Sequence, residues 1–222
     1  MQAPVDWRVN AVKELAMKQY QVKIFDLSGL KGLSDLQIET HLELYVGYVR
    51  NTNALNEQLA ELVHDGKAGT PAYSELTRRL GFEYNGMRLH ELYFENLTSE
   101  RTERDASSPL VAGLARHFRS FEAWRRDFIN VASMRGVGWA ILYQDLETGR
   151  LSNHWITLHE HGHPAGFRPL LVMDVWEHAY LVDYTPMERE RYINAFFANV
   201  DWPVVEARLT RSANGMKRVL SG

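Results

Sequence analysis

The stretch GVGWAILYQDLETGRLSNHWITL, residues 136–158, carries the change of hydrophobic period that decides the fold class. Its segments 139–143 and 151–158 are rich in aromatic and β-branched residues, which is typical of β-strands. The connection between them includes Leu-Glu-Thr-Gly-Arg, and a short connection containing glycine is typical of a β-hairpin. A third apolar run, 167–173, predicts one more buried strand.

The chain before this hairpin has the period of α-helices. Ser34 and Gln37 have the spacing of a capping box, and the apolar stripe that follows predicts a helix to about residue 63. Thr70 followed by Pro71 is a typical helix start, so a second helix is predicted to about residue 97, with glycines at 81 and 86 as places for a break. The first half is therefore predicted to be a long helical hairpin.

Shorter helical patterns surround the predicted strands. They lie after residue 105, near which the long helical stretches give way to shorter elements. They cover 109–117, 121–134, 175–182 and 187–199. Helices first, then helices around a small sheet, indicate an α+β fold. We expect a helical-hairpin domain at 1–104 and an α/β domain at 105–222.

Composition excludes several classes of function. With 222 residues, 45% hydrophobic and 24% charged, the chain has an ordinary globular composition, and no apolar run approaches the ~20 residues of a membrane helix. A net charge of −3 gives no basic field for nucleic acid. The absence of cysteine excludes disulfides, thiolate metal sites and cysteine nucleophiles. Because the first residues lack a basic segment followed by an apolar one, we expect no secretory signal and a cytoplasmic protein.

Nine histidines are the natural candidates for metal ligands in a chain without cysteine. Asp174 and His178 are four residues apart, so on a helix both would face one ion, although a solvated ion pair has the same spacing. His41 has tyrosines at i+4 and i+7, and His90 has aromatic residues at i+3 and i+4. Each of these two could equally be a core histidine bonded to one tyrosine.

A His-Glu-x-x-His pattern begins at His159 and ends at His163. In zinc peptidases this pattern places both histidines on one face of a helix. Here Gly162 interrupts it and Pro164 follows it, so a continuous helix is not expected, and a solvated loop rich in histidine is the alternative.

Several segments together resemble the iron/manganese superoxide dismutase family. Asp-Val-Trp-Glu-His-Ala-Tyr at 174–180 is similar to the family signature over seven consecutive residues. The similarity extends, in order, over roughly 35–205, and the first 30 or so residues and the tail after Arg208 lie outside it. The other similar segments are 48–53, 89–97, 136–140, 169–174, 192–196 and 199–202.

The resemblance implies a helical hairpin followed by an α/β domain with a three-stranded antiparallel sheet. It also implies one Fe or Mn ion per chain, bound by three histidines, one aspartate and a solvent molecule. Carried over residue by residue, the ligands are His41, His90, Asp174 and His178. His41 is one residue closer to Tyr48 than is usual in the family, and no other histidine is available nearby.

Residues around the metal carry over as well. The resemblance implies that Tyr48 is the gateway tyrosine, that Trp139 and Trp176 are the aromatic wall, and that Arg189 is near the substrate funnel.

The group that bonds the metal-bound solvent is glutamine four residues before the second ligand in some members, and that position is Gly86 here. The donor is then expected from the sheet side, where counting back from Asp174 gives His159, with His161 as the second choice.

The resemblance predicts a superoxide dismutase, with superoxide and protons as substrates. A homodimer is implied through contacts between Glu177 and the partner's ligand histidine, with a tetramer left open. Tyr45 and Leu181 replace a histidine and a tyrosine that bond across the family's dimer, which puts that contact in doubt. The alternative is a dismutase-fold protein that binds metal or a partner without efficient turnover. A histidine donor slightly favours iron over manganese.

Overall fold

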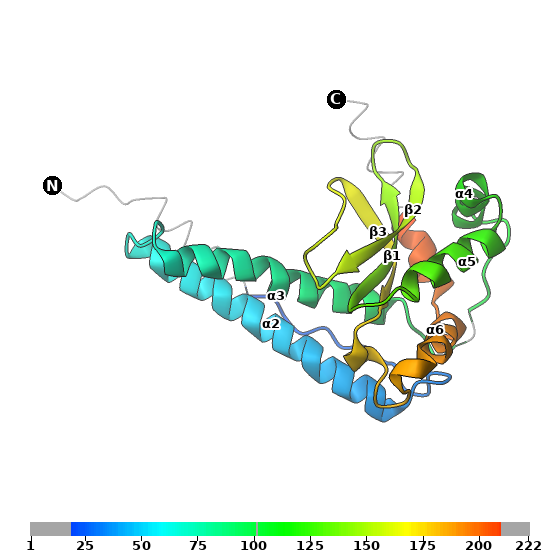
Figure 1. Ribbon diagram of the computed structural model, residues 1–222, viewed down its shortest axis with the longest axis horizontal. Coiled ribbons are helices and arrows are strands. Elements are labelled where there is room, and N and C mark those ends of the chain that lie inside the picture. Colours follow the sequence, from blue (N-terminus) through cyan, green and yellow to red (C-terminus); the bar gives the residue numbers. More distant parts are fainter. Residues whose placement is uncertain (1–18, 101, 210–222) are drawn as a thin grey trace.

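The computed structural model describes residues 19–100 and 102–209. A long hairpin of α2 (Asp35–His64) and α3 (Pro71–Glu95) extends from one side of the molecule, as Figure 1 shows. The second half contains α4 (Pro109–Phe118), α5 (Phe121–Ala132), a small sheet, α6 (Arg189–Ala198) and a helical segment at 202–209. The predicted α+β class is confirmed, whereas the N-terminal residues 1–18 and the tail from 210 lie outside the described residues.

Hydroxyl side chains begin helices α2, α3, α4 and α5. Each accepts a hydrogen bond from a backbone N–H two or three residues into its helix, and two of the helices also have proline in the first turn. The caps are Ser34, Thr70, Ser108 and Ser120. Helix α3 continues through Gly81 and Gly86 without a break, so the break considered from the sequence does not occur.

The sheet has three antiparallel strands in the order β2-β1-β3. They are β1 (Gly138–Asp145), β2 (Leu151–Thr157) and β3 (Phe167–Asp174), as predicted from the hydrophobic runs. Strand β1 is central, and Trp139 is paired with Ile156 on one side and with Asp174 on the other. This register places Trp139 beside the last residue of β3.

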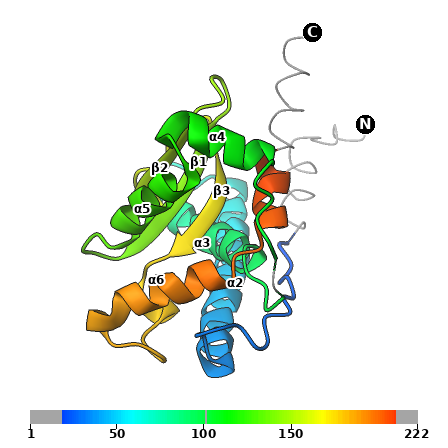
Figure 2. The same cartoon turned by 90° about the vertical axis from the view of Figure 1, so that its right-hand side faces the viewer.

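Helices cover both faces of the sheet, as the turned view in Figure 2 shows. Helix α3 packs against β3, α5 packs against β1 and β2, and α4 packs against β2. The core includes Trp124 and Phe128 from α5 and Tyr93 and Phe94 from α3, all of them fully buried or nearly so. The end of α3 is thus held against the end of β3, which brings the hairpin and the sheet into contact.

The segment after β3 differs from the sequence prediction. A helix was predicted over 175–182, but the structure has only a 3₁₀ turn at Glu177–Ala179, and a second 3₁₀ turn, Pro186–Glu188, precedes α6. Gln37 explains part of the difference, because its side chain donates to the His178 carbonyl at 2.7 Å and accepts from the Val182 N–H at 3.0 Å. These backbone groups are satisfied by the Gln37 side chain instead of by helical hydrogen bonds. The same side chain therefore does not bond back to Ser34, and only the Ser34 half of the predicted capping box is formed.

Candidate metal centre

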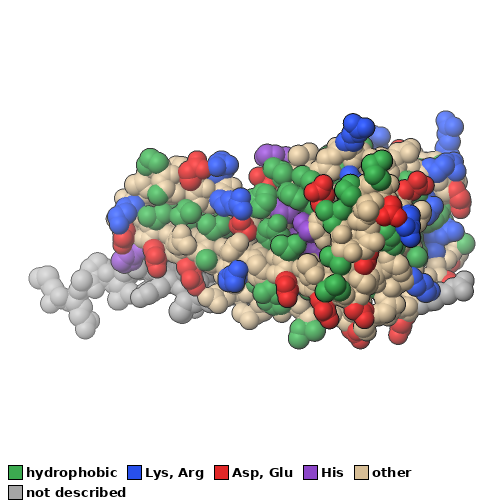
Figure 3. Space-filling model, turned by 60° about the horizontal axis from the view of Figure 1, so that its bottom comes forward, with side chains coloured by type: hydrophobic (Ala, Val, Ile, Leu, Met, Phe, Trp, Pro, Cys, Tyr) green, Lys and Arg blue, Asp and Glu red, His purple; other side chains and the backbone are tan. Residues whose placement is uncertain are grey.

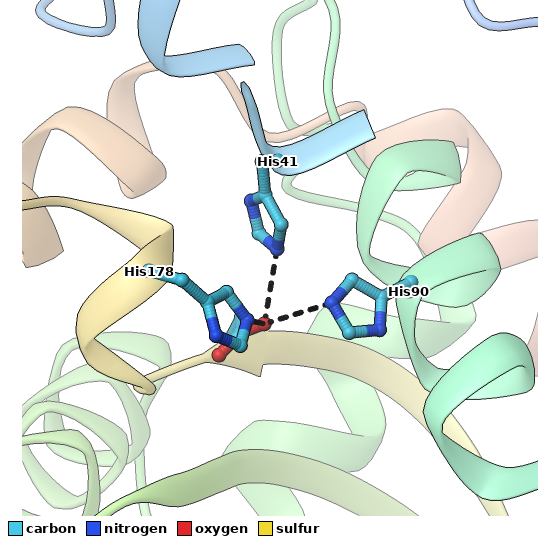
Figure 4. A group of neighbouring side chains, drawn as sticks. His41, His90 and His178 are labelled. Carbon is cyan, nitrogen blue, oxygen red and sulfur yellow. Dashed lines mark hydrogen bonds and ion pairs between the residues drawn. The ribbon is translucent and has the colours of Figure 1, made fainter. Parts of the chain in front are cut away.

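Three histidines and one aspartate meet where the hairpin contacts the sheet. His41 comes from α2, His90 from α3, Asp174 from the end of β3 and His178 from the 3₁₀ turn. The Nε2 atoms of His41 and His178 are each 3.1 Å from Asp174 Oδ2, and His90 Nε2 is 3.6 Å from it. Figure 4 shows the three imidazoles pointing toward one carboxylate oxygen. One donor atom from each residue lies within 4.8 Å of the others.

This arrangement fits a bound metal ion. Two donors that each lie about 2.1 Å from one ion at a right angle are about 3 Å apart, close to the separations seen here. His90 Nδ1 is 2.6 Å from the Gly86 carbonyl, which can only accept, so the proton is on Nδ1 and the Nε2 lone pair is free. That buried Nε2 atom has no hydrogen-bond partner among the described residues. Three imidazoles and one carboxylate are a donor set suited to Fe, Mn or Zn.

The charges of the four side chains favour a cation. Burial lowers the pKa of His41, and burial with the nearby His41 lowers that of His90 well below its usual value. Burial opposes ionisation of Asp174, but the neighbouring imidazoles of His178 and His41 outweigh it and hold the pKa of the carboxyl well below its usual range. The buried carboxylate therefore stays charged, and the lowered pKa values of His41 and His90 favour their neutral forms, which are the protonation states that metal binding requires.

Asp174 and His178 reach the centre from two different elements. They do not share the face of an α-helix, because Asp174 ends a strand and His178 lies in the turn that follows. Asp174 Oδ1 accepts from the Trp176 N–H at 2.8 Å, and the Asp174 carbonyl accepts from the Tyr192 hydroxyl at 2.7 Å. The first bond orients the carboxylate, and the second fixes the backbone that carries it. The Gln37 bond to the His178 carbonyl fixes the turn against α2.

A second group of side chains surrounds this cluster. His159 is fully buried, with Nε2 at 2.8 Å from the Tyr48 hydroxyl and Nδ1 at 3.1 Å from the Trp139 indole nitrogen. The indole N–H can only donate, so His159 Nδ1 accepts and the proton is on Nε2, from where it is donated toward Tyr48. Burial lowers the pKa of His159 to about 4, and burial raises the pKa of Tyr48. Both groups therefore hold their protons in neutral form near pH 7.

Aromatic rings enclose the cluster. Trp176 stacks between His159 and His178, with ring centroids 4.9 and 5.7 Å away. The Trp139 ring meets His90 edge-on at 5.0 Å, and Tyr48 lies 5.0 Å from the same imidazole. These rings leave little room for water beside the ligands.

Gly86 is required by the position of Tyr48. A Cβ at this position would lie 2.5 Å from Tyr48 Cδ1 and 2.7 Å from Cε1, whereas ordinary contacts between carbons are about 3.5–4.0 Å. The ring of Tyr48 therefore occupies the space that any side chain at position 86 would need. This agrees with a donor that comes from the sheet side, at His159.

Other predicted residues lie farther from the ligands. Arg189 begins α6, and its Nη1 donates to the Gly136 carbonyl at 3.2 Å. His161 is exposed, so it is not the side chain that meets Tyr48. His163 is turned toward Tyr143, with Nδ1 at 2.6 Å from that hydroxyl. Residues 158–160 form a turn, so His159 and His163 do not share a helix face and the zinc-peptidase geometry is not formed.

Sequence reasoning missed three contributors to the site. The sequence pattern indicates only a helix cap for Gln37 and only a place in a C-terminal helix for Tyr192. Phe82 was not singled out, although its ring lies 4.5 Å from that of His159. The only signal available for Phe82 was its place eight residues before His90, two helical turns away on α3.

Comparison with known proteins places this geometry in a family. A family model described as "Iron/manganese superoxide dismutases, C-terminal domain" matches residues 106–208. A "Superoxide dismutase [Fe]" of Aquifex pyrophilus is 37% identical over 188 residues, covering 82% of this chain and 87% of that protein. The chain belongs to the iron/manganese superoxide dismutase family. In this family, a "Superoxide dismutase [Mn] 2" of Haloferax volcanii is 36% identical over 77% of this chain and 81% of its own. A "Superoxide dismutase [Fe]" of Saccharolobus solfataricus is 31% identical, over 89% of this chain and 93% of its own.

No helix within residues 19–100 and 102–209 combines the length and the apolar character needed to cross a membrane.

Proposed function

We propose that this protein disproportionates superoxide, converting two superoxide anions and two protons into dioxygen and hydrogen peroxide. The observation that carries the proposal is the convergence of His41, His90, Asp174 and His178 on one point inside the protein. A bound Fe or Mn ion, one per chain, would supply the redox chemistry, taking an electron from one superoxide and giving one to the next. The relatives named above are similar over most of their length.

The chain's own residues set the conditions for that chemistry. Asp174 contributes the single negative charge of the ligand set, and the imidazoles contribute none, so the set can hold a metal in two oxidation states. Trp176 N–H and Tyr192 O–H hold the Asp174 carboxylate and backbone in one orientation. Rigid ligands limit the rearrangement that each electron transfer requires.

We assign the movement of protons to His159 and Tyr48. The Nε2–H of His159 is a fixed donor, because Trp139 holds the tautomer, and the Tyr48 hydroxyl accepts from it. His159 keeps this proton, and its hydrogen bond orients the Tyr48 hydroxyl, whose own O–H is the proton available to be passed to the reduced substrate. In this assignment His159 takes the outer-sphere position expected from the resemblance, with its N–H directed at Tyr48, and Tyr48 is the gateway residue.

The remaining assigned residues control access. Trp139 and Trp176 keep water and larger molecules from the ligands, and Arg189 provides local positive charge that draws an anion inward although the chain carries a net charge of −3. Burial lowers the pKa of Arg189, but it remains an arginine and stays charged at neutral pH.

We propose a cytoplasmic homodimer, with a tetramer left open, built from a helical hairpin at 1–104 and an α/β domain at 105–222. Glu177 is exposed beside His178, whose side chain is 20% exposed, so both are accessible to a second subunit. On the face drawn in Figure 3, histidine side chains are visible among hydrophobic ones. Leu36, Leu181 and Val182 are large apolar residues exposed on the protomer. We favour iron as the resident metal because the donor beside Tyr48 is a histidine.

The second candidate is a dismutase-fold protein that binds metal without efficient turnover. It rests on Tyr45, which is fully buried and bonded to the Lys23 N–H and to Glu91, so its hydroxyl serves the interior of its own subunit. Leu181 is exposed and has no polar group for a bond across the dimer.

The test is stopped-flow decay of superoxide on protein whose Fe and Mn contents have been measured. Fast decay that scales with one metal per chain supports the dismutase and names the metal. Asp174→Ala is expected to lose both metal and activity, because it removes the charge around which the three histidines are arranged. Full metal occupancy with decay no faster than free ions would refute catalysis and leave the binding protein.

A further inference from the structure

The loop that carries His159 is tightly constrained. Strand β2 ends at Thr157, and Thr157 and His161 exchange two backbone hydrogen bonds, of 2.9 and 3.2 Å, so only residues 158–160 connect them. Leu158 has a φ of 55°, which is uncommon for a residue with a side chain, and Gly162 has a φ of 103°. A loop in this conformation persists only where its surroundings determine it.

His163 is the side chain that holds this loop from behind. Its Nε2 atom is 2.8 Å from the carbonyl oxygen of His159, and its Nδ1 atom is 2.6 Å from the Tyr143 hydroxyl. A carbonyl only accepts, so the proton of His163 is on Nε2 and the Tyr143 O–H donates to Nδ1. Burial raises the pKa of Tyr143, so it keeps the proton that it donates.

We propose that His163 is a positioning residue for His159, and that Tyr143 in turn positions His163. The proposal rests on the proposed function, in which His159 is the hydrogen-bond donor to Tyr48 beside the metal ligands. Three links form the chain: Tyr143 on the central strand, His163 after the loop, and the backbone of His159 at its tip. Through them the stable sheet determines where the ring of His159 lies.

The ring of His159 needs this support because its own bonds require exact placement. It must reach Tyr48 from one nitrogen and Trp139 from the other while stacking on Trp176. The carbonyl of His159 does not take part in the Thr157–His161 bonds, and within residues 19–100 and 102–209 its hydrogen bond is to His163, so His163 is what fixes this carbonyl. A rotation of that peptide would move the His159 ring and so change the lengths and angles of its hydrogen bonds, which weaken steeply away from their preferred geometry.

His161 provides a matched control on the same loop. It is exposed, and its Nε2 atom lies 3.7 Å from a carboxylate oxygen of the neighbouring Glu160. A variant at His161 changes the same loop by the same number of atoms but leaves the support of His159 intact.

The experiment compares His163→Ala and His161→Ala in the full chain loaded with iron. The readouts are iron content, the reduction potential of the bound iron and the rate of superoxide decay. We expect His163→Ala to retain iron and to lose about tenfold in rate, since loss of one buried hydrogen bond of about 1.4 kcal/mol corresponds to a factor of ten. We also expect its reduction potential to shift in the same direction as that of His159→Gln. His161→Ala is expected to stay within about twofold of the parent protein, less than one such bond is worth.

A double-mutant cycle separates positioning from general stability. In a His159→Ala background, His163→Ala is expected to change neither rate nor potential further, because the group it positions is gone. His163→Gln is expected to restore part of the loss, since its amide can donate to the same carbonyl. Independent, additive effects in the cycle, or an unchanged potential in His163→Ala, would overturn the proposal.

Two further outcomes are informative. If His163→Ala fails to fold or to hold iron, Tyr143→Phe removes only the hydroxyl that orients His163, and an unchanged potential in that variant would overturn the proposal. If the parent protein binds iron without turning over superoxide, the proposed function fails, but the potentials of the variants still test the positioning of His159.

Discussion

Gly86→Ala is expected to displace Tyr48, and Gly81→Ala is its matched control. Both glycines lie inside α3, but a Cβ at 86 would be 2.5 Å from the Tyr48 ring, while a Cβ at 81 would meet nothing within 4 Å. The ring would have to move by about 1 Å to regain ordinary contact. Such a movement would break the 2.8 Å contact between Tyr48 and His159.

The two substitutions should change the free energy of unfolding in opposite directions. Alanine in place of glycine inside a helix stabilises by about 0.8–1 kcal/mol, and Gly81→Ala should show that full gain. At position 86 the same gain is opposed by overpacking, which costs about 1–3 kcal/mol, and by loss of one hydrogen bond worth about 1 kcal/mol. The free energy of unfolding of Gly86→Ala should therefore lie about 2–4 kcal/mol below that of Gly81→Ala.

Urea unfolding of both metal-loaded variants measures this difference, and superoxide decay measures the consequence at the site. Gly86→Ala should turn over more slowly with unchanged metal content, because Tyr48 contacts His90 only through its ring and binds no metal. The reasoning is refuted if Gly86→Ala is stabilised as much as Gly81→Ala and retains full turnover.

Three more predictions concern the side chains around the metal. Gln37→Leu keeps the volume but removes two bonds to the backbone at 178–182, so the free energy of unfolding should fall by about 2 kcal/mol in denaturant titration, and metal should be released more readily to a chelator. Tyr48→Phe removes the acceptor of the His159 Nε2–H, so turnover should fall several-fold with the metal content unchanged; equal turnover would exclude Tyr48 from proton transfer. The metal-free protein should lose stability on acidification, because the pKa of His159 is about 4 when folded and about 6.5 when unfolded. Below pH 6.5 His159 binds a proton in the unfolded chain but not in the folded chain. The free energy of unfolding should therefore fall by about 1.4 kcal/mol per pH unit, from His159 alone, down to about pH 4. His159→Gln should reduce this slope, which acid titration of the metal-free protein measures.

Much of the fold followed from local patterns. The caps at Ser34 and Thr70 and the apolar stripes behind them predicted the helical hairpin, and the change to a strand period predicted the sheet. The error at 175–182 came from reading a short apolar stretch as a helix, where Gln37 instead takes the backbone bonds. No local pattern carries that information, because Gln37 lies far away in the chain.

The metal centre shows the same division between local pattern and long-range packing. His41, His90, Asp174 and His178 were chosen from motif resemblance and from side-chain chemistry, and the structure brings all four together. The seven-residue spacing from His41 to Tyr48 corresponds to about two helical turns, so the regular helix α2 places both on one face.

The sequence by itself determined the helical hairpin, the three strands and which side chains can bind a metal, because periodicity, caps and donor chemistry are local properties. Only the tertiary structure decided that His159, and not His161, is buried against Tyr48 and Trp139, and that His163 holds its backbone. The two histidines lie two positions apart on one loop, and spacing gave His159 only as the first choice with His161 as the second. The path of the backbone through Leu158 and Gly162 turns one ring inward and leaves the other exposed, and that path is set by packing against the sheet and the hairpin.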